Sequence, residues 1–355
     1  MNTKRILLIL TGGTICSFAT ANAEQASDTE RAQALIVANF RNSDSEYSSE
    51  KCVEFIPSSP LDTLSENMTV IHWNALINNM KTYDFSKYDG VIILHGTDTL
   101  AYTAALLSLV LSGLPIPVIL VSSQLAPYNP EANGNANFKA AVELIVNGIE
   151  PNVYVVYRNE ETNGNESIKT MFVHYAAHIV QCANHSNNFY SKDMAPISSE
   201  NAVFKGCRSG AGAPIFMNER FDILSSKVLK IQPYVGLDYS RFSLDGVNAV
   251  VHGTYHSSTV ATNPKFPGAD CSKYSTMYLA QLCGKSNPPI PLFIEPFEKV
   301  TYETTGEAIR NGILPIKNLT SEMAYVKTLV GCSLGLSAEA LYDYINTNIN
   351  NEFLD

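Results

Sequence analysis

The chain has 355 residues, of which 45% are hydrophobic and 16% charged, so the composition indicates a folded protein with a large core. Its 24 Lys and Arg against 34 Asp and Glu give a net charge of −10, which argues against binding to nucleic acid or to anionic membranes. The apolar runs are well below the ~20 residues that a membrane-spanning helix needs.

The seven cysteines are irregularly spaced and include no Cys-x-x-Cys pair. This pattern argues against a disulfide framework or a zinc ribbon and favours a reducing compartment, so we expect a cytoplasmic protein. Export is the alternative, because Lys4 and Arg5 precede an apolar stretch as they do in signal peptides. Only five aliphatic residues, 6–10, come before a Thr-Gly-Gly-Thr interruption, which is short for a signal.

Those five aliphatic residues predict a buried strand, and Thr11-Gly12-Gly13-Thr14 predicts a tight turn directly after it. In an α/β protein this turn lies at the carboxyl edge of a parallel sheet, where ligands bind. The glycines let the backbone bend sharply, and Thr14 would then be a hydroxyl at the mouth of a strand, a suitable nucleophile. A plain turn without chemistry is the competing interpretation.

The same pattern returns at residues 90–112, where an aliphatic strand (90–94) ends in His95-Gly96-Thr97-Asp98-Thr99 and an apolar helix follows. Two such edges in one parallel sheet can bring Thr14 and Thr97 to the same crevice. Before it we expect a loop or lid over 16–43 that ends in a short helix. The remaining elements predicted for this half are strands at 51–57, 117–121 and 152–157 and helices at 70–80 and 137–147.

The alternation of strands and helices predicts an α/β fold: a doubly wound, mostly parallel sheet in an N-terminal catalytic domain, residues 1–186. A stretch rich in Ser, Asn, Gly and Pro, residues 187–218, is interpreted as the linker. Residues 219–355 are predicted to form a second, smaller α/β domain. Its expected strands are 227–231, 249–251 and 291–295, and its expected helices 276–282, 306–311, 320–329 and 338–348.

The two threonine motifs together resemble the signature motifs of bacterial-type L-asparaginases. Ser65-Glu66-Asn67-Met68-Thr69 resembles that family's substrate loop, and Ser122-Ser123-Gln124 its Gly-Ser-Gln turn. The segment 164–169, Gly-Asn-Glu-Ser-Ile-Lys, is similar to the one that ends in the family's active-site lysine, and it looks most like the cytoplasmic type I branch. The resemblance implies a two-domain amide hydrolase that assembles as a homodimer or homotetramer.

Amide hydrolysis needs a nucleophile, a proton acceptor and donors that face the developing oxyanion. Thr14 would supply the hydroxyl, and Thr97 with Lys169 would form a proton relay in which Asp98 orients the lysine. The backbone N–H groups of Gly13 and Gly96 are candidate oxyanion donors. The resemblance adds the substrate contacts: Ser65, in the loop with Glu66, and Asp98 hold the α-carboxylate and α-ammonium, and Thr97 lies beside them.

Single residues have plainer interpretations. Lys169 on its own reads as a solvated lysine, and Asp98 as a helix N-cap. His174 and His178 are spaced like a helical metal pair but lack a third ligand, so ordinary packing is favoured and no metal or cofactor is expected. By the resemblance, the neighbouring subunit's His256 is a candidate at the active site; a loop histidine is the alternative.

The family's lid tyrosine, some 10–13 residues after the first threonine, has no counterpart here, since the next tyrosine after Thr14 is Tyr47. Three functions are therefore compared. The first is hydrolysis of L-asparagine, with L-glutamine as a further substrate, and the second is an amino-acid-binding homologue of weak or no activity. The third is the amidase subunit of a tRNA-dependent amidotransferase; its extra N-terminal domain is not expected, because the signature begins at Thr11.

Overall fold

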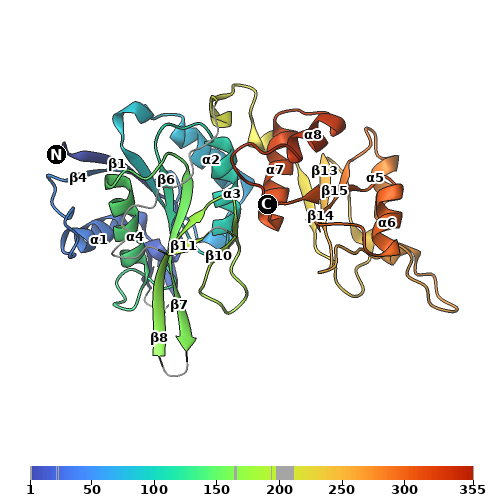
Figure 1. Cartoon of the computed structure of the whole chain (residues 1–355), viewed down its shortest axis with the longest axis horizontal. Coiled ribbons are helices and arrows are strands. Elements are labelled where there is room, and N and C mark those ends of the chain that lie inside the picture. Colours follow the sequence, from blue (N-terminus) through green and yellow to red (C-terminus); the bar gives the residue numbers. More distant parts are fainter. Residues whose placement is uncertain are drawn as a thin grey trace. The chain divides into compact units, whose positions relative to one another are not determined.

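The computed structural model describes residues 2–20, 22, 24–163, 166–192, 194–196 and 212–354 (Figure 1). It divides into two compact units, Met1–Glu219 with Ile349–Asn351, and Arg220–Asn348 with Glu352–Asp355. Both are α/β, so the expected fold class, with a second and smaller α/β part, is confirmed. Of the expected linker, residues 193 and 197–211 lie outside the described residues.

Unit 1 is built on a seven-stranded sheet in the order β11-β8-β7-β6-β5-β1-β4. The five strands from β4 to β7 are parallel, and β8 and β11 add an antiparallel edge. Their bounds are β1 Lys4–Leu10, β4 Val53–Ser58, β5 Gly90–Leu94, β6 Val118–Val121, β7 Val153–Asn163, β8 Glu166–Tyr175 and β11 Ala195–Pro196. The central strands are buried on both faces, as their unbroken aliphatic runs predict.

Helices cover both faces of this sheet. On one face, α1 (Thr29–Arg41) and α4 (Gly134–Val146) pack in a cluster with the even-numbered aliphatic residues of β1 and β5. Figure 1 shows α2 (Val70–Met80) and α3 (Leu100–Val110) together on the other face, where the indole of Trp73 donates to Thr103 Oγ1 at 2.9 Å. The sheet is therefore doubly wound.

Unit 1 also contains two short antiparallel strand pairs. The expected lid region contains the hairpin of β2 (Ser17–Ala19) and β3 (Gln25–Ser27), and α1 after it is longer than predicted. β9 (Ile179–Val180) pairs with β10 (Tyr190–Ser191). The segment between these last two strands, residues 181–189, loops back toward β7, where the backbone of Phe189 bonds with the side chain of Asn159.

Unit 2 has a four-stranded parallel sheet in the order β12-β13-β14-β15. Its elements are β12 Val228–Ile231, β13 Ala249–Gly253, α5 Thr276–Lys285, β14 Leu292–Phe297, α6 Glu303–Arg310, β15 Leu314–Lys317, α7 Ser321–Ser333 and α8 Ala338–Ile345. Sequence patterns did not predict β15, a four-residue edge strand that contains a proline. Within the described ranges no helix is both long and apolar enough to cross a bilayer.

Candidate active site

The carboxyl ends of β1 and β5 meet at one point. The strands are parallel neighbours with Leu10 opposite Leu94, and Thr11 donates from both its N–H and its hydroxyl to Leu94 O, at 3.1 and 2.9 Å. Beyond them the backbones of Gly13 and Gly96 touch: a Cβ added at Gly13 would lie 2.2 Å from the Gly96 Cα. Only glycine permits this approach, and Gly13 also has φ 77° and ψ −175°. Thr14 and Thr97, the next residue on each loop, therefore follow two glycines in contact.

A third segment, residues 63–65, closes around the two loops. The N–H of Gly13 donates to Thr63 O at 2.8 Å, so in this structure it is not free to serve as the oxyanion donor expected from sequence. The hydroxyl of Ser65 donates to Asp98 Oδ2 at 3.0 Å and accepts from the Asp98 N–H at 3.2 Å. Ser65 and Asp98, the two residues expected from sequence to hold the substrate, are thus hydrogen-bonded to each other. The Asp98 side chain does not cap α3, whose N-cap is Thr99.

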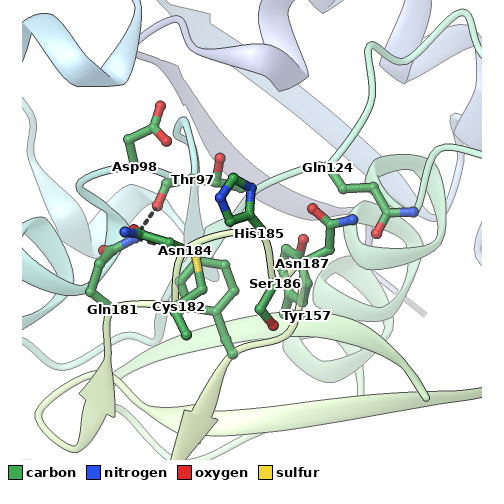
Figure 2. Close-up of a pocket in the computed structure, with 12 residues that line it drawn as sticks. Thr97, Asp98, Gln124, Tyr157, Gln181, Cys182, Asn184, His185, Ser186 and Asn187 are labelled. Carbon is green, nitrogen blue, oxygen red and sulfur yellow. Dashed lines mark hydrogen bonds between the residues drawn. The ribbon is translucent and has the colours of Figure 1, made fainter. Parts of the chain in front are cut away.

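A cavity of about 450 Å³ opens beside Thr97 and Asp98 (Figure 2). Four carboxamide side chains line it, and none was singled out from sequence except Gln124 within its motif. Its lining residues are Thr97, Asp98, Gln124, Tyr157, Gln181, Cys182, Ala183, Asn184, His185, Ser186, Asn187 and Phe189. Eight of them come from the connection between β9 and β10, a polar run that the sequence showed only as composition.

This connection is fixed at both ends. At one end the side-chain amide of Gln181 donates to Thr97 O at 2.8 Å and accepts from the Ala101 N–H at 3.3 Å, which ties it to the start of α3. At the other end the side-chain amide of Asn159, on β7, makes two hydrogen bonds with the backbone of Phe189, at 2.8 and 3.0 Å. The side chain of Asn188 makes the reciprocal pair of bonds with the backbone of Glu160, at 2.9 and 3.0 Å.

Burial sets the protonation of two lining groups. Desolvation raises the pKa of Tyr157 to about 12 and raises the pKa of the Cys182 thiol, so both remain protonated at neutral pH. Close by, complete burial lowers the pKa of His95 to about 4, which keeps that imidazole neutral. Asp98 and His185 contribute a carboxylate and an imidazole to the same lining.

Several expected site residues lie away from the cavity lining. Thr14 is half-buried at the start of a 3₁₀ turn, Thr14–Cys16, and Glu66 is exposed beside Ser65. Lys169 lies on β8 opposite Glu160, with a side chain that is 38% exposed and an ion pair to Glu131 at 3.5 Å. Its motif begins at Gly164 and Asn165, which lie outside the described residues.

Three further expectations concern histidines and the lid. His256 belongs to unit 2 and lines a separate hollow there with Tyr255 and Ser257. His174 and His178 lie on β8 and in the turn after it, not on a helix. The lid hairpin rests on Tyr128: Phe18 stacks on that ring at 5.8 Å between centroids, and Gln25 donates to its hydroxyl at 3.1 Å.

Comparison with known proteins identifies the family. The model of the N-terminal asparaginase domain matches residues 5–200, more than half of the chain, so the chain belongs to the asparaginase family, as the two threonine motifs predicted.

Among curated relatives, the L-asparaginase of Thermococcus kodakarensis is 26% identical over 98% of both chains. A glutamyl-tRNA(Gln) amidotransferase component from Methanococcus maripaludis strain C6 is also 26% identical, over 92% of this chain and 75% of that protein. Among solved structures, the Thermococcus kodakarensis L-asparaginase has a TM-score of 0.74 at 21% identity, covering 98% of this chain and 99% of that one. L-asparaginase I of Vibrio cholerae has a TM-score of 0.70 at 22% identity, over 99% of both.

Proposed function

We propose that this protein hydrolyses the side-chain amide of L-asparagine to L-aspartate and ammonia, through an acyl intermediate on Thr14. The observation that carries the proposal is the contact of Gly13 with Gly96, together with the Ser65–Asp98 hydrogen bonds. It supports a site in which two threonine hydroxyls and a carboxylate serve one substrate. The Asp98 carboxylate suits the α-ammonium of an amino acid by its charge.

The chemistry follows from these groups. Thr14 attacks the side-chain carbonyl, its proton passes to the Thr97 oxygen, and ammonia leaves once it has received a proton. Water then repeats the sequence on the acyl-threonine. The proton acceptor behind Thr97 is predicted from sequence to be Lys169, which pairs with Glu131 at 3.5 Å and is not among the residues that line the cavity.

Ammonia release tests the proposal. The purified protein is incubated with L-asparagine and with L-glutamine, and the ammonia released is measured with a coupled dehydrogenase. We expect release from L-asparagine that falls by at least about 1,000-fold in Thr14→Ala, because the nucleophile is lost. Full activity of Thr14→Ala, or no release by the wild-type protein, would reject the proposal. Binding of aspartate in a calorimeter without turnover would instead favour a non-catalytic amino-acid-binding homologue.

A second function is favoured by the amidotransferase relatives, which match 92% of this chain at the same identity as an asparaginase. In that role the ammonia would be passed to a partner protein. Co-purification from the native source distinguishes the two: a stable complex with a tRNA-binding protein supports the amidotransferase role, whereas a homodimer or homotetramer supports the free hydrolase. We also propose a cytoplasmic location, since the six cysteines within the described ranges are all free thiols.

A further inference from the structure

Tyr128 is brought to the β2–β3 hairpin from a distant part of the chain, the connection between β6 and α4. Its ring stacks on Phe18 of β2 with an interplanar angle of 24°, and its hydroxyl accepts a hydrogen bond from the side chain of Gln25, on β3. One side chain thus contacts both strands of the hairpin. The hairpin supplies no tyrosine of its own, because the sequence has none between Thr14 and Tyr47.

The hairpin begins where the 3₁₀ turn that carries Thr14 ends. Ser17, the first residue of β2, donates from its N–H to Thr14 O and from its hydroxyl to Gly13 O, the latter at 2.9 Å. Directly after β3, the Asp28 N–H donates to Cys16 O at 2.8 Å. The turn is therefore bonded to the chain at both ends of the hairpin, so the position of the Thr14 hydroxyl depends on where the hairpin is held.

Phe18 is the residue through which Tyr128 reaches this turn. It follows Ser17 directly, is only 6% exposed and belongs to the same apolar cluster as α1 and α4. The guanidinium carbon of Arg31, on α1, lies 4.0 Å from the centre of its ring. Tyr128 is 47% exposed, so it covers Phe18 from the solvent side, and a stacked aromatic pair attracts beyond the area that it buries. Loss of the Tyr128 ring would uncover Phe18 and loosen β2 beside Thr14.

The segment that carries Tyr128 is itself fixed to the helices of unit 1. The carbonyl of Pro127 accepts a hydrogen bond at 3.1 Å from the side chain of Asn135, on α4. The same Asn135 side chain accepts a bond at 3.0 Å from Asn39, on α1. The segment also begins beside the cavity, because Gln124 is one of the lining residues (Figure 2). Tyr128 therefore joins the hairpin to fixed elements of the site, and a group supported in this way keeps its geometry more precisely.

We propose that Tyr128 is a positioning residue of this site: by stacking on Phe18 it holds the β2–β3 hairpin, and with it the Thr14 hydroxyl, in place for attack on the amide carbonyl. In this role Tyr128 acts through Phe18 and takes no part in the proton transfers. The effect is large enough to measure, because a displacement of about 1 Å at a reacting group costs up to about 100-fold in rate. The role rests on the proposed hydrolysis, and the experiments below separate the two.

Variants at Tyr128 and Phe18 test the role by kinetics. In Tyr128→Ala we expect kcat for L-asparagine to fall by about 10- to 100-fold, with KM changed by less than about threefold, because the expected substrate contacts are unaltered. Tyr128→Phe keeps the stacked ring and should keep kcat within about threefold of wild type. In a Phe18→Leu background, Tyr128→Ala should lower kcat by less than about threefold further, because residues that act through one contact are not additive.

Hydrogen exchange gives a readout that does not depend on activity. The amides of Ser17 and Asp28, which donate to the turn that carries Thr14, should exchange at least about tenfold faster in Tyr128→Ala than in wild type.

Tyr83→Ala serves as the matched control, because it also removes a tyrosine from an aromatic pair of unit 1, with Tyr88 at 6.1 Å, in the connection between α2 and β5. It should keep kcat within about twofold of wild type and leave the exchange of both amides unchanged.

If Tyr128→Ala retains kcat within about threefold while wild type is active, the positioning role is overturned and the proposed function stands. Unchanged exchange of the Ser17 and Asp28 amides in that variant also overturns the role. So does a Tyr128→Phe variant as impaired as Tyr128→Ala, because the stacked ring would then not be what acts. A wild-type protein that releases no ammonia from L-asparagine or L-glutamine overturns both the role and the proposed function.

Discussion

The variant Gly96→Ala tests whether the loops that follow β1 and β5 are in contact at Gly13 and Gly96. Gly96 is not among the glycines with a positive φ, so an alanine there would be penalised by contact alone. The added Cβ would lie 2.4 Å from Ser65 Oγ, 2.5 Å from Ser65 Cβ and 2.9 Å from Gly13 Cα. Ordinary contact begins near 3.4 Å, so Ser65 is too close by 3.4 − 2.4 = 1.0 Å.

The cost follows from that displacement. Overpacking of this size costs about 1–3 kcal/mol. Moving Ser65 by this amount also breaks its 3.0 Å bond to Asp98, which removes about 0.5–1.5 kcal/mol more. We therefore expect the free energy of unfolding to fall by about 1.5–4.5 kcal/mol in urea denaturation followed by circular dichroism. Ammonia release should fall by about 100-fold, because a 1 Å misplacement at a reacting centre costs this much.

Two comparisons sharpen the test. Gly284→Ala, on α5 with no atom within 4 Å of the added Cβ, should be neutral or stabilising by about 0.5–1 kcal/mol. Adding Ser65→Gly to Gly96→Ala removes the two nearest clashing atoms and leaves Gly13 Cα in place, so the two changes should be coupled by at least about 1 kcal/mol. Equal stability of the Gly96 and Gly284 variants, or strictly additive effects in the double variant, would show that the strand ends do not meet as described.

Three further predictions concern stability. Burial lowers the pKa of His95 and of His252 to about 4, so between about pH 6.5 and 4 the unfolded chain binds more protons than the folded one. Stability should therefore decline on acidification, by about 2 kcal/mol for each histidine at pH 5. The urea midpoint should depend less steeply on pH in His95→Gln than in the wild type, and an unchanged pH dependence would contradict the reasoning. Lys327→Met should cost about 3–5 kcal/mol in thermal or urea unfolding, because it removes the ammonium that pairs with the fully buried Glu352 carboxylate. Adding Glu352→Gln should recover part of that loss, and a neutral single variant would contradict the ion pair. Asn159→Ala should cost about 1–3 kcal/mol and lower kcat, measured by urea unfolding and ammonia release, since it frees Phe189 and the connection that lines the cavity; retention of both values would argue against a fixed loop.

The sequence predicted those features of the fold that local residue patterns determine. The strand 90–94 was placed at its observed bounds, and the helix 70–80 begins at its predicted cap, Thr69. Runs of aliphatic residues and capping chemistry are properties of the chain itself, and parallel pairing then brings the ends of β1 and β5 together without further information.

Local residue patterns did not predict the cavity. Its wall is the connection around His185, which owes its place to bonds between Asn159 and Phe189 and between Gln181 and Thr97, all formed by residues far apart in the chain. The only signal in the sequence was an amide-rich run with a histidine inside it. The long β7–β8 hairpin was likewise seen only as a polar stretch, and its strand register is what places Lys169 opposite Glu160.

The most direct test of the account is to trap the acyl intermediate. The wild-type protein is mixed with L-asparagine, quenched in acid within the first turnover and digested for mass spectrometry. The account predicts an aspartyl adduct on the peptide that contains Thr14, present in the wild type and lost in Thr14→Ala. Turnover of L-asparagine with the adduct on another residue, or continued turnover by Thr14→Ala, would contradict it.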